Sequence, residues 1–98
     1  MSKYAKRKDG NHDEIRSAFE AAGWTWIDLY RFPGQLDGEI VKQGPRQLFC
    51  VIRVEVKMLK ETLTAAEEKF IDKWPGLVIV VYTATDAVWR AGEMLSKY

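Results

Sequence analysis

The chain has 98 residues, which is enough for one domain with a modest core but not for two. Its hydrophobic share of 47% and aromatic share of 12% exclude an intrinsically disordered chain. The net charge of +1 excludes a strong overall attraction to polyanions, so charge alone does not identify a nucleic-acid partner.

Neither a membrane protein nor a secreted protein is expected. No run of the sequence approaches the ~18 apolar residues of a membrane span, and the charged N-terminus lacks the apolar stretch of a secretory signal. The single Cys50 lies in an apolar stretch and cannot form an internal disulfide, so we predict a buried core residue rather than a redox or catalytic thiol. Together these features predict a cytoplasmic protein.

Residues 1–10 are predicted to form a flexible basic arm, and residues 11–98 a single domain. The basic residues of the arm are Lys3, Lys6, Arg7 and Lys8. Such a cluster is able to contact phosphates. A solvated, frayed terminus is the alternative, and charge alone favours it.

The sequence from 11 to 22 predicts a first helix. Its apolar residues follow the i, i+3, i+4, i+7 spacing of one buried face and are Ile15, Ala18, Phe19 and Ala22. Asn11 is expected to cap this helix with Glu14 at the capping-box position, and Gly23 to end it. His12, the only histidine, is predicted to be exposed at the helix start, with a role as a base as the alternative.

Three strands are predicted next, as an antiparallel meander over residues 24–30, 37–41 and 48–57. They are rich in aromatic and β-branched residues and are separated by turns that contain glycine and proline. In the third strand the side chains alternate between two faces. One face carries Ile52, Val54 and Val56, and the other carries Arg53, Glu55 and Lys57.

The last third of the sequence predicts helix, strand and helix. Thr64 is expected to cap a second helix with Glu67 at its capping-box position, and Pro75 follows the end of that helix. Residues 77–82 are almost wholly apolar and predict a buried, central strand. A final helix follows the cap at 83–86. The predicted order is α-β-β-β-α-β-α, which describes an α/β fold with a mixed sheet flanked by helices.

The polar residues around the third strand predict a metal site. Magnesium prefers hard oxygen ligands and keeps several waters, so one or two carboxylates are enough to hold it. Asp37, which follows a turn, and Glu55 are the candidate ligands for Mg²⁺ or Mn²⁺, with the Val56 carbonyl as a third. Lys57 leaves the same strand face as Glu55, where its ammonium is placed to orient water or neutralise charge on a phosphate. This set predicts metal-dependent phosphodiester hydrolysis.

Each of these residues also has an ordinary structural explanation. An E-x-K pair on a strand is often a solvated ion pair worth ~0–1 kcal/mol, and an aspartate such as Asp37 is typical of a turn. The order of the motifs favours catalysis: an acid after a turn, a hairpin, E-x-K on a β-branched strand, then a helix and an apolar strand.

In this order of motifs the chain resembles the PD-(D/E)XK nuclease superfamily, and within it the small VRR-NUC-type and Holliday-junction-resolvase-like nucleases of phages and bacteria. The matching segments are Asn11-His12-Asp13-Glu14-Ile15, Gly34-Gln35-Leu36-Asp37-Gly38, Val54-Glu55-Val56-Lys57, Leu63-Thr64-Ala65-Ala66-Glu67 and Asp86-Ala87-Val88. The resemblance extends over nearly the whole chain from residue 11 and implies a restriction-endonuclease-like αβββαβ core with a C-terminal helix. The family's turn proline is replaced by Leu36.

The resemblance implies that Asp37, Glu55 and the Val56 carbonyl are metal ligands and that Lys57 is the catalytic lysine. It also implies a Mg²⁺-dependent endonuclease that acts on branched DNA such as four-way junctions, a homodimer, and a bacterial or phage-infected host cell. Glu14 matches the family's acid on the first helix, near the metal, and the capping box remains its alternative.

Glu67 stands where the family usually has glutamine. It either contacts the site or caps the second helix, and we favour capping. This replacement adds negative charge near the expected phosphate position. It is the departure from the family pattern that bears most on the predicted activity.

Other residues are candidates for nucleic-acid contacts. Arg31, Arg53 and Lys60 flank the predicted site and are candidate phosphate contacts, with solvated surface as the alternative. The tryptophans are able to stack on bases, but their positions favour core or dimer contacts. They are Trp24, Trp26, Trp74 and Trp89.

Two alternatives to this function remain. One is a non-catalytic nucleic-acid-binding or structural phage module with the same fold, and the other is a sequence-specific or non-specific nuclease of the same superfamily. The acids favour an enzyme, because clustered carboxylates repel phosphate and serve no purpose in a pure DNA binder.

Overall fold

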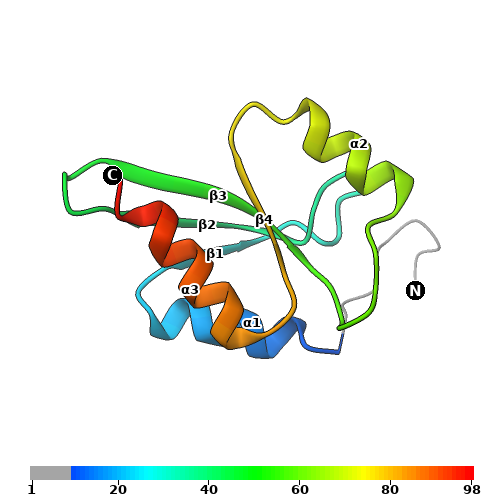
Figure 1. Cartoon of the computed structure of the whole chain (residues 1–98), viewed down its shortest axis with the longest axis horizontal. Helices are drawn as coiled ribbons and strands as arrows, with labels where there is room; N and C mark the ends of the chain where they lie inside the picture. The colour runs from blue at the N-terminus through cyan, green and yellow to red at the C-terminus, as the bar shows by residue number, and fades with distance from the viewer. Residues whose placement is uncertain (1–9) are drawn as a thin grey trace.

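The computed structural model describes residues 10–98; the arm residues Lys6, Arg7 and Lys8 lie outside the described residues. Within the described part, the elements are α1 (His12–Ala21), β1 (Thr25–Asp28), β2 (Gly38–Gln43), β3 (Phe49–Val56), α2 (Ala65–Lys73), β4 (Leu77–Val81) and α3 (Ala84–Leu95). The predicted order of helices and strands and the α/β class are confirmed (Figure 1).

The four strands form one mixed sheet in the order β1-β2-β3-β4. The first three pair antiparallel, as the predicted meander requires, and β4 joins β3 in parallel after the connection through α2. β4 therefore lies at an edge of the sheet, and the prediction of a central strand is wrong. The apolar run reflects burial by neighbouring elements and not a central position in the sheet. Ile79 and Val81 are buried, and the other residues of β4 are half-buried.

α1 and α3 lie together against one face of the sheet, and α2 stands on the other side (Figure 1). The core fills the space under α1 and α3. Phe19 of α1 stacks on Trp26 of β1, with 6.0 Å between ring centroids. Cys50 is buried in this core, as predicted. β3 contributes Ile52, Val54 and Val56, all fully buried. At ~1.5–3 kcal/mol for each such side chain, this layer supplies much of the stability.

Gly38 allows the indole ring of Trp26 to pack directly against the backbone at the start of β2. A Cβ atom at this position would lie 2.4 Å from Cζ2 of Trp26, well inside van der Waals contact. Only glycine therefore fits here without displacing the indole ring. Because Gly38 directly follows Asp37, this close packing also fixes the position of Asp37 at the start of β2.

The start of α1 differs from the prediction. The Asn11 side chain makes no cap hydrogen bond to the helix. Its Nδ2 donates instead to the carbonyl of Lys57 over 3.0 Å and to the carbonyl of Tyr82 over 2.7 Å. The capping box with Glu14 is therefore not formed, because the amide satisfies carbonyls beyond the ends of two strands. Glu14 lies on the exposed side of α1.

His12 is buried, so the prediction of an exposed histidine is wrong. Only 1% of it is exposed. Its ring packs edge-on against Trp26 and Tyr30, with both pairs of centroids 5.4 Å apart. Local sequence signals predict an exposed residue at a helix start, whereas this burial comes from aromatic residues 14 and 18 positions further along the chain.

The predicted caps of the later helices are confirmed. At α2 the Glu67 N–H donates to Thr64 Oγ1 over 3.1 Å, and the Thr64 N–H donates to Glu67 Oε1 over 2.8 Å. At α3 the Asp86 N–H donates to Thr83 Oγ1 over 3.1 Å. Across residues 10–98, no helix combines the length and the apolar character needed to cross a membrane.

Candidate active site

Asp37 lies directly before β2, at the position opposite Glu55 of β3. The antiparallel register pairs Gly38 with Val54, and one further step of that register sets Asp37 opposite Glu55. The Leu29 N–H donates to the Asp37 carbonyl over 2.9 Å, so the pairing with the neighbouring strand extends to Asp37. Residues opposite one another on antiparallel strands point to the same face, with Cβ atoms ~5 Å apart. The two predicted carboxylates therefore share one face of the sheet.

A hydrogen bond fixes the Asp37 carboxylate against β3. The Val56 N–H donates to Asp37 Oδ2 over 2.7 Å. This donor lies in the backbone between Glu55 and Lys57, so the acid from the turn is tied to the middle of the E-x-K motif. Asp37 is only 3% exposed. It is more than a turn residue, because its side chain joins β2 to the end of β3.

Glu55 and Lys57 project from the same face of β3, as the strand period predicts. Lys57 Nζ lies 3.7 Å from Glu55 Oε2 and 2.7 Å from Glu67 Oε1. All three residues are buried. The alternative of a solvated E-x-K pair is therefore wrong, since α2 brings a second acid over the lysine and removes the cluster from water. Buried charges of this kind persist only when they are paired.

The Glu67 carboxylate carries negative charge inside this cluster. Burial by itself would raise the pKa of Glu67, but a hydrogen bond with Glu55, the Lys57 ammonium and the Thr64 N–H together lower that pKa to about 2. The site therefore holds an ionised Glu67 in direct contact with the Lys57 ammonium, 2.7 Å away.

Two residues of the cluster were not assigned to the site from the sequence. Glu67 was expected to cap α2, and it does so, but the same Oε1 atom also binds Lys57. The sequence signal that linked this position to the site was the resemblance to PD-(D/E)XK nucleases, which usually have glutamine there. Asn11 was expected to cap α1, yet it holds the backbone carbonyl of Lys57. No local sequence signal predicted that contact, which spans 46 residues.

The flanking basic residues lie in different surroundings. Arg53 is half-buried: its Nε donates to Glu39 over 2.6 Å, and its guanidinium carbon lies 4.2 Å from the centroid of the Trp74 ring. The solvated-surface alternative is therefore wrong for Arg53. Arg31 and Lys60 are exposed. Their contacts with phosphate, like those of Arg53, stay predictions.

The oxygen donors at this site suit a hard divalent cation. Asp37 and Glu55 present carboxylates on one face, and the described part of the chain holds no group of three or more His, Cys, Asp or Glu residues arranged around a metal position. Magnesium needs only one or two protein carboxylates because waters complete its shell. Val56, the proposed carbonyl ligand, is the last residue of β3. The role of Glu14 on exposed α1 stays a prediction.

Comparisons of the chain with models of protein families, with curated proteins and with solved structures found no match.

Proposed function

We propose that the chain is a metal-dependent endonuclease that hydrolyses phosphodiester bonds in DNA. The observation that carries this proposal is a buried set in which Lys57 contacts Glu55 and the Asp37 carboxylate binds the backbone between them. Burying three charged groups is costly in a protein that uses them only for stability. Perturbed, clustered ionisable groups are more typical of functional sites than of structural ones.

The order of helices and strands supports the more specific proposal that the fold has a PD-(D/E)XK nuclease core. An acid enters at the start of β2, the E-x-K motif ends β3, and a helix then leads to a parallel β4. That topology supports the proposal, because it brings the two strands that carry the proposed metal ligands side by side. The matching motifs named from the sequence fall on these elements in the same order.

Each residue has a defined task in the proposed reaction. Asp37 and Glu55 hold Mg²⁺ or Mn²⁺, which supplies Lewis-acid activation of water and of a phosphate oxygen. Lys57 neutralises charge that develops on the scissile phosphate. Two acids hold its ammonium in place before any substrate binds, which lowers the cost of organising the site.

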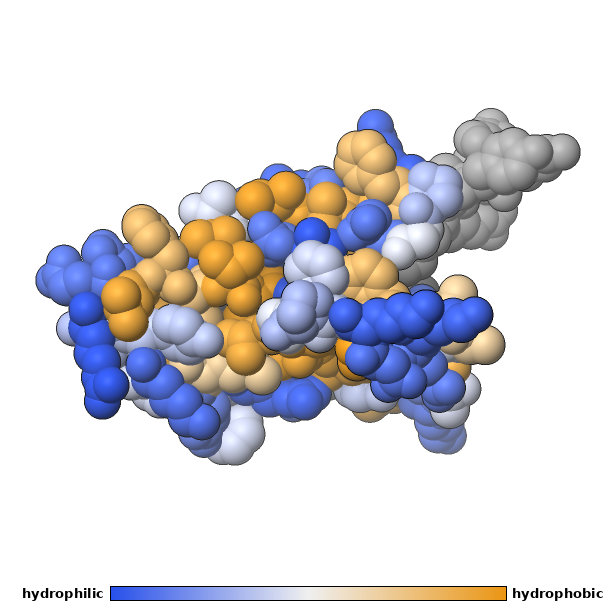
Figure 2. Space-filling view, turned by 90° about the horizontal axis from the view of Figure 1, so that it is seen from above, coloured by the Kyte–Doolittle hydropathy of each residue, from blue (hydrophilic) through white to orange (hydrophobic). Residues whose placement is uncertain are grey.

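We further propose that two copies form a homodimer through the open half of the sheet. The face that carries Glu55 also carries Val51 and Phe49 toward the other end of β3, with 42% and 66% exposed. Seen from the side of α2, apolar side chains gather over the left and middle of the surface (Figure 2). An uncharged patch suits a symmetric contact, and a two-fold pair of sites suits branched DNA.

The proposed function is tested by incubating the protein with labelled four-way junctions, duplexes and single strands in Mg²⁺, Mn²⁺ or EDTA. We expect cleavage with either metal and none in EDTA. Glu55→Gln and Lys57→Ala should each reduce cleavage by at least about a hundredfold. Glu68→Gln and Lys69→Ala are matched controls, because both residues are exposed on α2.

Two results decide against this account. Retained DNA binding without metal-dependent cleavage by the wild-type protein would favour the non-catalytic binding module. Normal cleavage by Glu55→Gln or Lys57→Ala would leave the enzyme in place but refute the assigned site.

A further inference from the structure

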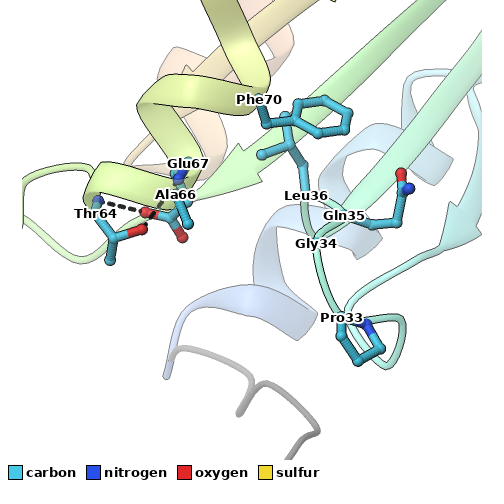
Figure 3. Close-up of a pocket in the computed structure, with 8 residues that line it drawn as sticks. All are labelled: Pro33, Gly34, Gln35, Leu36, Thr64, Ala66, Glu67 and Phe70. Carbon is cyan, nitrogen blue, oxygen red and sulfur yellow. Dashed lines mark hydrogen bonds between the residues drawn. The ribbon is translucent and has the colours of Figure 1, made fainter.

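A cleft of about 310 Å³ opens beside the candidate active site. It lies between the turn before β2 and the first half of α2 (Figure 3). The turn supplies Pro33, Gly34, Gln35 and Leu36, and the helix side supplies Thr64, Ala66, Glu67 and Phe70. Nothing in the proposed hydrolysis uses this cleft, although its walls adjoin the catalytic groups on both sides.

We propose that this cleft binds a single unpaired nucleobase of the DNA strand being cut. The inference rests on the proposed nuclease function and names its substrate class: DNA with an unpaired nucleotide next to the cleaved phosphate. A cleft of this size lies at the lower end of the range for small-molecule sites. It has room for one base, and a base of duplex DNA reaches such a cleft only after it leaves the base stack.

The cleft is continuous with the catalytic cluster. Glu67 forms part of its wall, and the Oε1 atom of that residue lies 2.7 Å from Lys57 Nζ. On the opposite wall, Leu36 directly precedes Asp37 in the chain. A base held in the cleft would therefore lie next to the position proposed for the phosphate. This spacing matches a single nucleotide, in which base and phosphate are neighbours.

The walls of the cleft suit a flat, weakly polar ring. Phe70 projects from α2 toward Leu36 and Gln35 (Figure 3). Its ring stacks on Trp74 with 5.2 Å between centroids, which holds it in one orientation. Aromatic side chains stack on bases without needing a particular base. At Gly34 an added Cβ would meet nothing within 4 Å, so the entrance is open beside the turn.

Polar groups on the wall are placed to hold the edge of a base. Gln35 Oε1 accepts a hydrogen bond from Arg53 Nη1 over 2.6 Å, which fixes the side-chain amide and leaves its N–H groups to donate to a ligand. Thr64 and the ionised Glu67 also line the cleft. A few polar groups in a mainly apolar cleft are typical of a site that orients a small planar ligand.

The test measures DNA binding with Ca²⁺ in place of Mg²⁺, using the full chain and fluorescence anisotropy. Three labelled duplexes are compared: one fully paired, one with a single bulged thymidine, and one with an abasic residue in the bulge. We expect the bulged thymidine to bind roughly tenfold more tightly than either of the others, which is within the range measured for one base stacked on an aromatic side chain. The abasic bulge separates recognition of the base from recognition of bent backbone.

Variants assign the effect to the cleft. Phe70→Ala should remove the preference for the bulged base and leave binding of the paired duplex unchanged. Ala66→Trp, at an exposed position on the wall, should fill the cleft and have the same effect without removing a packed ring. Trp89→Ala is the matched control, because that ring lies exposed on α3 outside the cleft and should keep the preference.

The proposal is overturned if the base-containing bulge and the abasic bulge bind equally, if Phe70→Ala and Ala66→Trp keep the preference, or if no DNA binds. The nuclease function is judged separately by Mg²⁺-dependent cleavage. Cleavage without any preference for the unpaired base would leave the nuclease in place and refute the cleft. A base-dependent preference without cleavage would support the cleft and refute the nuclease.

Discussion

Glu67 joins the fold of α2 to the chemistry of the site. One oxygen of this residue accepts from the Thr64 N–H and contacts Lys57 Nζ. The sequence predicted the first contact because a capping box has a local spacing. It did not predict the second, because a contact between a helix and a strand ten residues earlier depends on how the two elements pack. The burial of His12 has the same cause, since its neighbours Trp26 and Tyr30 are distant in the chain.

Stability below neutral pH should depend on Glu67. Its pKa falls from 4.5 to about 2 on folding, so its stabilising effect is complete above about pH 4.5 and is lost as the pH falls toward about 2. The shift corresponds to at most about 3 kcal/mol. Glu67→Gln keeps a hydrogen-bond acceptor for the Thr64 N–H but cannot titrate. Its free energy of unfolding should therefore fall less between these pH values than that of the wild type.

Urea unfolding in EDTA at pH 5, 4, 3 and 2.5 measures this difference. Glu68→Gln is the control, because that glutamate is exposed one residue further along α2 and should follow the wild type. Parallel pH curves for the wild type and Glu67→Gln would mean that Glu67 is not ionised by its partners in the folded state.

At the scale of elements, periodicity predicted the helices and strands, and the alternation of β3 predicted which residues face the core. Val54 and Val56 are buried under α1 and α3, while Glu55 and Lys57 share the other face. The edge position of β4 was not predicted. An apolar run such as residues 77–81 specifies burial, but strand order depends on where α2 carries the chain after β3.

The position of the start of β2 depends on Gly38, which has no side chain to collide with Trp26. Gly38→Ala should lower the free energy of unfolding by about 1–3 kcal/mol, because the added methyl group overlaps Trp26. Gly92→Ala makes the same chemical change in α3, where an added Cβ meets nothing within 4 Å. That variant should be stabilised by up to about 1 kcal/mol through helix propensity.

Chemical denaturation of the two alanine variants beside the wild type provides the measurement. A Gly38→Ala protein as stable as the wild type would show that the indole ring of Trp26 does not hold the start of β2, and with it Asp37, in the described place. Destabilisation of both variants alike would point to an effect of glycine replacement that is unrelated to this contact.

For the whole molecule, the composition predicted a single folded chain, and the motifs predicted which face of the sheet carries the acids. The surface that remains open could not be predicted, because it depends on α1 and α3 covering the same face (Figure 1). The result is a sheet face with a charged end under α2 and an apolar end that holds Val51 and Phe49.

The oligomeric state should respond to a charge in the apolar end. If two copies pair there, Phe49→Asp should convert the protein to a monomer, since the substitution would bury an unpaired carboxylate in each copy. Light scattering after size-exclusion chromatography measures the mass. Trp89→Asp changes an exposed aromatic residue on α3 instead and should leave the dimer intact. A monomeric wild type would refute the proposed homodimer, and a dimeric Phe49→Asp variant would place the contact on another surface.

The central claim is that Asp37 and Glu55 hold one divalent cation beside Lys57. Anomalous diffraction from crystals of the protein grown with Mn²⁺ tests it most directly, with the Glu55→Gln variant crystallised under the same conditions. We predict one strong peak in the wild type within bonding distance of both carboxylates, and its loss in the variant. A Mn²⁺ peak at any other residues, or a peak that persists in Glu55→Gln, would contradict the account.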